Sequence, residues 1–445
     1  MANESAEDDI YDVVGVGFGP ANLAFAIAVE EHNESRSPQE RLRAVFVERQ
    51  PDFGWHRGML LDGTTMQVAF PKDLVTFRNP TSSYSFFAYL HDRGRLVDFV
   101  NHQTFFPTRL EFNDYLTWAA ERLDTEVRYG RTVTRVDKAP PAGTATVLLD
   151  DGSRVRTRNV VAGVGLTERI PAWATRSPRC FHNHHFLYRI AELPEPKHNR
   201  FVVLGAGQSA AEIVAYLHRT YPHAEVHSVF ARWGYSPADD SPFANRIFDP
   251  STVDEFHRAP AGERDRLLRL HRGTNYSVVD VELIHELYAR EYQERVRGDR
   301  RLYMRRASEV TSATETTDGI DVEVRSTLED LTDTLRCDAL VLCTGFEPAG
   351  IDALFGGLIP QGGERNVARD YRVRTFRDVS AGIYLQGGTE DTHGLSSSLL
   401  SNVAVRAGEI LDSIVARRTV NGGVVAVEEC GRRTNPTPLV SSEVR

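Results

Sequence analysis

Residues 11–20 read YDVVGVGFGP, an apolar strand that runs into three glycines and a proline. An alanine-rich helix follows, with Leu23 and Ile27 on one face, and a second strand at 44–48 ends in an acid. A glycine turn lets a pyrophosphate approach the positive end of a helix, and an acid ending the next strand can hold a ribose hydroxyl. The unit therefore predicts a dinucleotide site that includes Gly15, Gly17, Gly19, Pro20 and Glu48.

Residues 201–210 read FVVLGAGQSA and repeat this strand-turn-helix pattern. The strand that follows, near 226–230, leads into Ala231 and Arg232 and carries no terminal acid. An arginine in place of the acid suits the 2′-phosphate of NADPH, which favours NADPH over NADH. We expect the NADPH contacts of this unit to include Gly205, Gly207, Gln208, Ser209 and Arg232.

Two dinucleotide sites in one chain indicate FAD at the first and NADPH at the second, because hydride transfer to a flavin brings both cofactors together. The predicted fold class is α/β, with two Rossmann-like dinucleotide-binding domains and a small, mostly helical substrate-binding region. The buried-strand run CDALVLCTG at 337–345 is expected to return the chain to the FAD domain and close it.

We expect the following domain organisation. The FAD domain takes residues 1–165, and the NADPH domain takes 166–345 with a helical substrate-binding segment at about 235–300. Residues 346–430 return to the FAD domain and contribute substrate contacts, and 431–445 form a disordered tail.

The composition disfavours several classes of protein. The chain of 445 residues has 52 Lys plus Arg against 62 Asp plus Glu, a formal net charge of −10, which argues against a nucleic-acid partner. No apolar stretch approaches the roughly 18–20 residues of a spanning helix, and the acidic start lacks the marks of a signal peptide, so we expect a cytoplasmic protein without a membrane segment. Four cysteines without CxxC or zinc-ligand spacing predict neither a disulfide scaffold nor a metal.

Eight longer motifs are more specific than these general patterns. They are GVGFGPANL at 15–23, WHRGM at 55–59, MQVAFPKDL at 66–74, TFRNP at 76–80, GAGQSAAEI at 205–213, DDSPFANRIFDP at 239–250, TNYSVV at 274–279 and GGTEDTHGLSSSLLSN at 387–402. Together they resemble the microbial flavin-dependent N-hydroxylating monooxygenases, and within them the L-ornithine N5-hydroxylases that feed hydroxamate siderophore synthesis. Two departures are Pro71, where the family usually has an aliphatic residue, and CTGF at 343–346, which replaces ATGY.

The resemblance implies a reaction in which NADPH reduces FAD and O₂ adds to give a C4a-hydroperoxyflavin. The side-chain amine of L-ornithine then attacks the distal oxygen, which gives N5-hydroxy-L-ornithine, while NADP⁺ stays bound and shields the intermediate. A homotetramer or a homodimer is also implied.

The resemblance further implies residue roles. Lys72 and Asn245 would hold the α-carboxylate and α-amino region of the substrate, and Asn275 would lie between the nicotinamide ribose and the substrate. Gln67, beside the flavin ring, would help to position the hydroperoxide, and Ser398 or a neighbouring serine would face the substrate amine. Gln67, Asn275 and Ser398 are thus the expected catalytic residues. Other expected FAD contacts are Trp55, His56, Arg109, His393 and Leu395, and other expected NADPH contacts are Tyr276 and Thr344.

The residues around Lys72 support its role independently of the resemblance. Val68, Phe70, Leu74 and Phe77 make its surroundings apolar, and a charged side chain in such surroundings is usually paired or functional. A free amino acid presents a carboxylate, for which a lysine is a suitable anchor.

Four alternatives stay open at this stage. An L-lysine N6-hydroxylase differs by one substrate methylene, which a pocket discriminates by only about 1–3 kcal/mol. A flavin monooxygenase acting on carbon or sulfur would favour an FxGxxxHxxxW motif, which the region around Phe181 does not supply. A disulfide reductase is disfavoured because the chain has no CxxC, and a cofactor-binding redox regulator would form no hydroxylamine.

Overall fold

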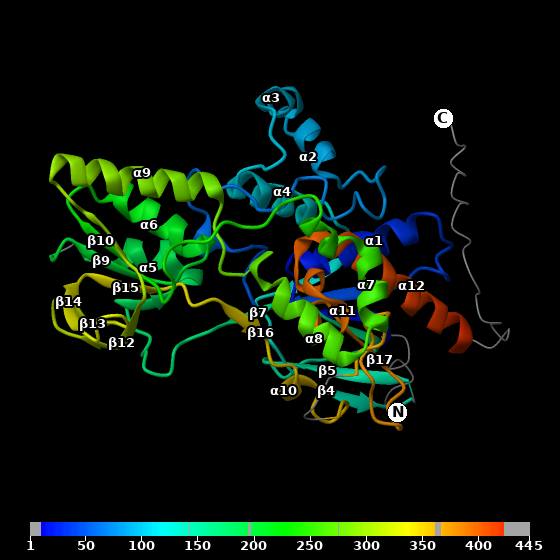
Figure 1. The fold of residues 1–445 in the computed structure, drawn as a ribbon. Helices are drawn as coiled ribbons and strands as arrows, with labels where there is room; N and C mark the ends of the chain where they lie inside the picture. The colour runs from blue at the N-terminus through cyan, green and yellow to red at the C-terminus, as the bar shows by residue number, and fades with distance from the viewer. Residues whose placement is uncertain (1–9, 142, 195–196, 275, 361–365, 422–445) are drawn as a thin grey trace, which may run out of the picture.

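The computed structural model describes residues 10–141, 143–194, 197–274, 276–360 and 366–421. Three predictions from the sequence lie outside what the structure describes: the position of Asn275, the side chain of Ser398 and the tail at 431–445. Figure 1 shows two sheet-centred parts, with the first sheet beside α1 and α12 on the right and the second beside α6 and α9 on the left.

The first sheet has seven strands in the order β3-β2-β1-β6-β5-β4, with β17 paired to β6. Strands β1, β2, β3, β6 and β17 run parallel, and the β4-β5 and β5-β6 pairs are antiparallel. The strands are β1 (Ile10–Val16), β2 (Ala44–Glu48), β3 (Glu126–Tyr129), β4 (Val133–Ala139), β5 (Thr144–Leu149), β6 (Arg154–Ala162) and β17 (Gly382–Leu385).

Helices cover one face of the first sheet because their apolar side chains need a buried surface. Phe25 of α1 (Pro20–Glu34) and Ile410 of α12 (Val403–Asn421) share a core with Phe46 of β2. The same core includes residues of α2 (Phe86–Asp92), α3 (Leu96–His102) and α4 (Arg109–Glu121), and Figure 1 shows α2 and α3 projecting upward from the rest. On the opposite face, Phe355 of α10 (Asp352–Phe355) packs in a second core.

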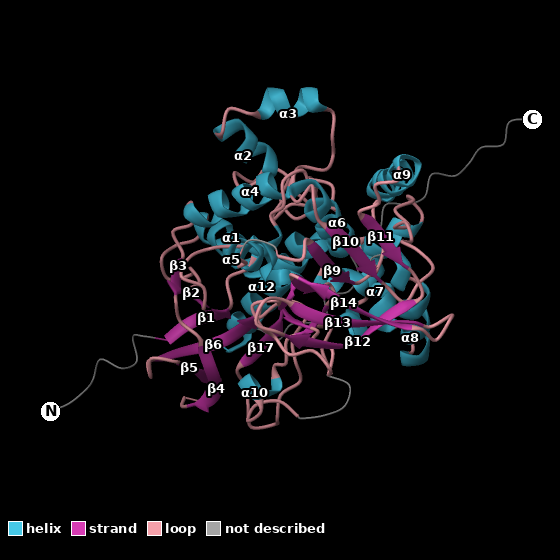
Figure 2. Ribbon diagram, turned by 90° about the vertical axis from the view of Figure 1, so that its left-hand side faces the viewer, coloured by secondary structure: helices cyan, strands magenta, loops and turns pink. Residues whose placement is uncertain are grey.

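The second sheet is entirely parallel, in the order β11-β10-β9-β15-β8. Its strands are β8 (Cys180–His182), β9 (Arg200–Leu204), β10 (Glu225–Val229), β11 (Leu302–Arg305) and β15 (Ala339–Leu342). One face packs with α5 (Phe186–Glu192), α6 (Gln208–Thr220) and α9 (Val281–Arg297). The other is covered by an antiparallel sheet of β12 (Ser308–Glu315), β13 (Ile320–Ser326) and β14 (Thr332–Cys337), as Figure 2 shows.

The predicted fold class is confirmed, but the expectation for 337–345 is wrong. Strand β15 lies between β9 and β8, so this run completes the second sheet and does not close the first. A buried parallel strand has the same apolar pattern in either sheet, and periodicity cannot tell which neighbours it will pair with. The strand that returns to the first sheet is β17, beside β6. Short antiparallel strands β7 (Leu166–Glu168) and β16 (Phe346–Pro348) pair where the chain passes between the sheets.

The segment between β10 and β11 is helical. It contains η3 (Ala244–Phe248), α7 (Pro250–Arg258), α8 (Ala261–Leu270), η4 (Arg272–Thr274) and α9. Helices α7 and α8 contact α11 (Glu390–His393) of the returning chain, whereas α9 packs on α6. The remaining short helices are η1 (Arg57–Met59), η2 (Asn183–His185), η5 (Leu395–Ser398) and η6 (Leu400–Asn402).

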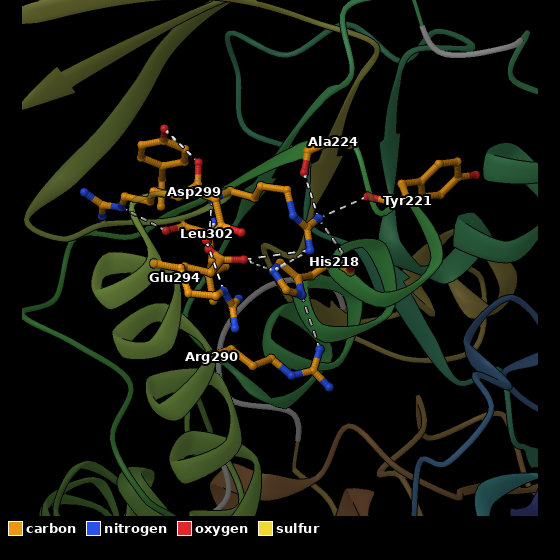
Figure 3. A network of polar contacts seen from close by, with 11 residues as sticks. His218, Tyr221, Ala224, Arg290, Glu294, Asp299 and Leu302 are labelled. Atoms are coloured by element: carbon orange, nitrogen blue, oxygen red, sulfur yellow. Dashed lines mark hydrogen bonds and ion pairs between the residues drawn. The ribbon is translucent and has the colours of Figure 1, made fainter.

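A buried polar network fixes α9 against α6 and the start of β11 (Figure 3). Glu294 on α9 is 2% exposed, and its Oε1 lies 2.6 Å from Nε2 of His218 on α6. Its Oε2 accepts hydrogen bonds from the backbone N–H groups of Arg301 and Leu302, both at 2.8 Å. The network therefore links α6 and α9 to the start of β11. Within the described part of the chain, none of the helices is both long and apolar enough to span a bilayer.

Candidate active site

The first glycine turn, where β1 meets α1, leaves no room for a side chain at Gly15 or Gly17. Gly17 has φ +81°, and a Cβ there would lie 2.6 Å from the carbonyl oxygen of Gly163. A Cβ on Gly15 would lie 2.1 Å from the Phe46 ring. Gly19 is the N-cap of α1 with Pro20 behind it, and a Cβ on Gly19 would meet nothing within 4 Å. The helix N-terminus therefore faces open space, which is where a pyrophosphate would bind.

Glu48 ends β2 beside this turn, as the sequence predicts. Its buried carboxylate accepts hydrogen bonds from the backbone N–H of Phe18 at 2.6 Å and of Gln50 at 2.8 Å. A carboxylate has about four acceptor positions, so two remain for a ribose.

The returning segment 387–402 contains buried polar atoms that have no hydrogen-bond partner in the structure. They are the hydroxyls of Thr389 and Ser397 and both amide atoms of Asn402. Arg406, 2% exposed, donates hydrogen bonds to Gln386 Oε1 at 3.0 Å and to the Ser397 carbonyl, which fixes this segment against β17. Gln386, which directly precedes this segment, donates to the Ala21 carbonyl at the start of α1 at 3.0 Å. Unpaired buried polar atoms in a segment anchored there fit a large polar ligand such as FAD.

The second glycine turn is equally constrained. Gly205 has φ +146°, and a Cβ there would lie 2.4 Å from the Cys343 carbonyl oxygen. Gly207 is the N-cap of α6, with Gln208 and Ser209 in its first turn. A Cβ on Gly207 would lie 3.5 Å from the Cα of Ser277, so the helix start faces the segment after η4. The side chain of Arg232 reaches the same segment, because its Nη1 donates to the Ser277 carbonyl at 2.8 Å.

A polar network joins the two sheet-centred parts at this point. Gln67, from the loop before α2, donates through Nε2 to Oδ2 of Asp280 at 2.7 Å. Gln208 donates to the same oxygen at 3.0 Å and to Glu212 Oε1 at 3.1 Å. Burial raises the pKa of Asp280, and the hydrogen bond from Gln67 opposes that shift. Gln67 therefore bridges the two sheet-centred parts, and its flavin contact stays a prediction.

Arg109 takes part in an unexpected contact across the same boundary. It begins α4, and its Nη1 and Nη2 donate to Oε2 and Oε1 of Glu212 on α6 at 2.9 and 2.8 Å. The side chains are 12% and 3% exposed, so this is a buried bidentate ion pair. Arg109 also donates to the Met59 carbonyl at 3.1 Å. The FAD contact expected for Arg109 stays a prediction, and its observed partner is protein.

Sequence reasoning missed Glu212 and Asp280. Glu212 follows Gln208 by one helical turn on a helix whose other neighbours are apolar and buried. A charged residue at such a position usually has a partner, so the apolar neighbours of Glu212 are the sequence feature that indicates a paired carboxylate. Asp280 is the N-cap residue of α9, and in the sequence it has the pattern of an ordinary helix cap.

Lys72 and Asn245 lie on neighbouring segments. The Lys72 ammonium is 5.9 Å from the centre of the Phe248 ring, and Phe248 ends the short helix η3 that contains Asn245. Lys72 is half-buried, and no ion pair joins it to a described carboxylate. Burial lowers its pKa, and Asp249 partly offsets that shift. Asn245 donates from Nδ2 to the Asp240 carbonyl at 2.7 Å, which leaves its amide oxygen as an acceptor.

Two of the other predicted contact residues, Tyr276 and Thr344, form hydrogen bonds to protein groups, whereas two others cannot be placed. Tyr276 donates its hydroxyl proton to Glu390 of α11, and so connects the segment after η4 to the returning chain. Thr344 donates to the Arg169 carbonyl between the two sheets. Asn275 and the side chain of Ser398 lie outside the described residues, so their roles stay predictions.

Trp55 and His56, two of the predicted FAD contacts, lie next to each other. Trp55 packs edge-on against Phe112 with ring centroids 6.0 Å apart, next to His56. Burial, with the charges of His184 and Arg109, lowers the pKa of His56 to about 4.

Leu395 and His393 are both buried in the returning segment. The His393 ring stacks on Tyr371 at 4.2 Å, and its nitrogens contact Thr392 Oγ1 and the Arg369 carbonyl. Burial lowers its pKa to about 3. Its ring nitrogens are thus already engaged by protein, and its cofactor contact stays a prediction.

Comparison with known proteins agrees with this geometry. The family described as L-lysine 6-monooxygenase/L-ornithine 5-monooxygenase matches residues 9–348. The chain belongs to this family. It is 42% identical to the L-ornithine N(5)-monooxygenase of Burkholderia cepacia over 87% of this chain and 90% of that protein. It is 38% identical to the enzyme of the same name from Pseudomonas aeruginosa over 93% of this chain and 96% of that protein.

Solved structures of family members are also similar. The ornithine N-hydroxylase of Kutzneria sp. 744, described with reduced FAD, NADP⁺ and L-ornithine, superposes with a TM-score of 0.87 and 44% identity. The L-lysine 6-monooxygenase of Pseudomonas syringae gives a TM-score of 0.79 and 36% identity. Both matches cover 92% of this chain and 100% of the other. Thioredoxin reductase of T. acidophilum, at 12% identity and a TM-score of 0.56, shares the fold alone.

Proposed function

We propose that the protein is an FAD- and NADPH-dependent monooxygenase that hydroxylates the side-chain amine of L-ornithine, for a hydroxamate siderophore or a related natural product. The observation that carries the proposal is the half-buried Lys72 ammonium, which has no described carboxylate partner and lies beside the helix of Asn245. Family relatives named for L-ornithine cover most of the chain and support this substrate.

The two glycine turns fit the two cofactors. We assign FAD to the turn at Gly17 and Gly19, with Glu48 toward its ribose, and NADPH to the turn at Gly205 and Gly207. When bound, FAD accepts a hydride from NADPH and activates O₂, which supplies the hydroxyl oxygen. In domain terms, residues 1–165 and 346–430 then serve FAD and residues 166–345 serve NADPH.

The chain binds and orients the amino acid in this proposal. The Lys72 ammonium pairs with the substrate carboxylate, and the free amide oxygen of Asn245 accepts from its α-ammonium. The side-chain amine must be neutral to act as a nucleophile, whereas its reference pKa is near the ~10.4 of lysine. Desolvation beside the cofactors lowers that pKa, because burial disfavours an ammonium. Asn275 and Ser398 complete the proposed site at the nicotinamide ribose and at the amine.

A cytoplasmic homodimer or homotetramer is part of the proposal. Helix α9 supports self-association because Tyr288, Tyr292 and Val296 lie about one turn apart and are 71%, 61% and 70% exposed. Such an apolar row is unusual for a surface that stays in water. L-Lysine hydroxylation is the second candidate, favoured by the similarity to the P. syringae enzyme.

The experiment that tests the proposed site compares Lys72→Ala with Lys138→Ala, whose exposed lysine pairs with Asp378. Loss of a charge-assisted contact worth roughly 1.5–3 kcal/mol should raise the KM for L-ornithine by one to two decades in Lys72→Ala. FAD content should match the wild type in both variants, and Lys138→Ala should keep the wild-type KM. An unchanged KM in Lys72→Ala would remove Lys72 from the substrate site.

A further inference from the structure

Arg306 is an exposed arginine that no part of the proposed function uses. It follows β11, and its guanidinium lies 4.7 Å from the ring centre of Trp233. No ion pair joins Arg306 or Arg232 to a described carboxylate. The acids of the neighbouring strands already have partners, since Asp333 pairs with Arg305 and Glu309 with Arg325.

The sheet register brings Arg306 beside Arg232. Strands β10 and β11 are parallel, with Val229 opposite Arg305, so the residues after both strands leave the same edge of the sheet. Two backbone hydrogen bonds fix this edge, from Phe230 N–H to the Arg305 carbonyl at 3.2 Å and from Ala307 N–H to the Arg232 carbonyl at 2.8 Å. Arg306 therefore lies between Arg305 and Ala307, and both of these residues are hydrogen-bonded to the segment that leads from β10 to Trp233.

The same edge adjoins the second glycine turn. Arg232 donates to the Ser277 carbonyl, and Ser277 Cα lies 3.5 Å from where a Gly207 Cβ would be. A ligand whose pyrophosphate lies at the start of α6 therefore extends its adenosine ribose toward the end of β10. Two exposed arginines without described acid partners follow these neighbouring strand ends, and such a pair fits a dianionic phosphate, which arginine binds through paired N–H groups.

We infer that Arg306 is a second specificity residue for the 2′-phosphate of NADPH, acting with Arg232, and that Trp233 positions its guanidinium by stacking. The inference rests on the proposed NADPH site and names a residue directly after β11, which the usual strand-turn-helix unit does not include. One arginine at the end of β10 gives a preference for the phosphate, and the second strengthens it.

The test measures binding and not turnover. Isothermal titration of the FAD-loaded full chain with 2′,5′-ADP and with 5′-AMP isolates the contribution of the 2′-phosphate. Arg306→Gln should weaken 2′,5′-ADP binding about tenfold and change 5′-AMP binding by less than about twofold. Trp233→Ala should weaken 2′,5′-ADP binding to a smaller extent, and Arg306→Lys should retain part of the affinity.

The matched control is Arg300→Gln. Arg300 stacks on Tyr303 at 4.5 Å, just before β11 at the opposite edge of the sheet, and its removal deletes the same charge. It should leave both affinities unchanged. Equal weakening in Arg306→Gln and Arg300→Gln would show a general charge effect and overturn the inference, as would an unchanged affinity in Arg306→Gln.

Failure of the inference is separable from failure of the proposed function. If Arg232→Gln loses the preference for 2′,5′-ADP while Arg306→Gln keeps it, the NADPH site stands with one arginine and the role of Arg306 is refuted. If the wild type binds both nucleotides equally, the inference and the NADPH assignment both fail, whereas hydroxylation of ornithine is judged separately by product analysis.

Discussion

The ion pair between Arg109 and Glu212 should couple the two sheet-centred parts of the chain energetically. Its two hydrogen bonds measure 2.9 and 2.8 Å, and the two side chains are 12% and 3% exposed. Removing one member of a buried pair leaves an unpaired buried charge and typically costs about 3–5 kcal/mol, whereas an apolar replacement of both is often nearly neutral. Because Arg109 keeps the Met59 carbonyl as an acceptor, we expect Glu212→Leu to cost about 3 kcal/mol, at the low end of that range.

A double-mutant cycle measures this coupling. Urea unfolding of FAD-loaded Arg109→Met, Glu212→Leu and the double variant, followed by tryptophan fluorescence and flavin release, gives the free energy of unfolding of each. We expect both single variants to be strongly destabilised and the double variant to recover most of the loss. The matched control is the pair of Arg336 on β14 and Asp321 on β13, which is also bidentate but 48% and 27% exposed. Its single variants should stay close to the wild type.

The reasoning is refuted if the Arg109 and Glu212 variants behave like those of the exposed pair. It is also refuted if the double variant loses as much as the sum of the single variants, because additivity would mean that the two side chains do not interact.

Two further predictions concern the cofactor turn and the substrate anchor. Gly17→Ala should purify without FAD because its Cβ meets the Gly163 carbonyl oxygen at 2.6 Å. Gly63→Ala, at a similar φ of +77° but with nothing within 4 Å, should keep its flavin, so equal flavin content in the two purified variants would contradict the steric argument. Burial lowers the pKa of Lys72, so its ammonium is lost at a lower pH than that of free lysine, and the KM for L-ornithine should rise as the pH rises through that lowered pKa. Lys72→Arg should move this rise to higher pH, and an identical pH profile of KM in the two proteins would refute the assignment.

The local parts of the site could be predicted from the sequence. The positions of Gly17 after β1, Glu48 at the end of β2 and Arg232 after β10 each follow from a strand, a tight turn and a helix in close succession, and the structure has these positions. The cofactor contacts of these residues stay predictions. The resemblance to N-hydroxylating monooxygenases was equally readable because its motifs are long, and the family match confirms it.

The remaining features depend on contacts between distant parts of the chain. The strand at 339–342 carries no local signal that selects its neighbours β8 and β9, so its sequence does not indicate to which of the two sheets it belongs. Arg109 and Glu212 are 103 residues apart, and neither position reveals the other. The contact of Gln67 with Asp280 likewise requires the two sheets to be positioned relative to one another.

The measurement that tests the central claim most directly is a competition between two substrates. The FAD-loaded enzyme receives NADPH, isotopically labelled O₂ and equal concentrations of L-ornithine and L-lysine, and mass spectrometry locates the label in the products. We predict label on the side-chain nitrogen of ornithine, in at least about tenfold excess over labelled lysine, because one methylene is worth roughly 1–3 kcal/mol. NADPH consumption that yields only hydrogen peroxide, or labelled lysine in excess over ornithine, would contradict the account.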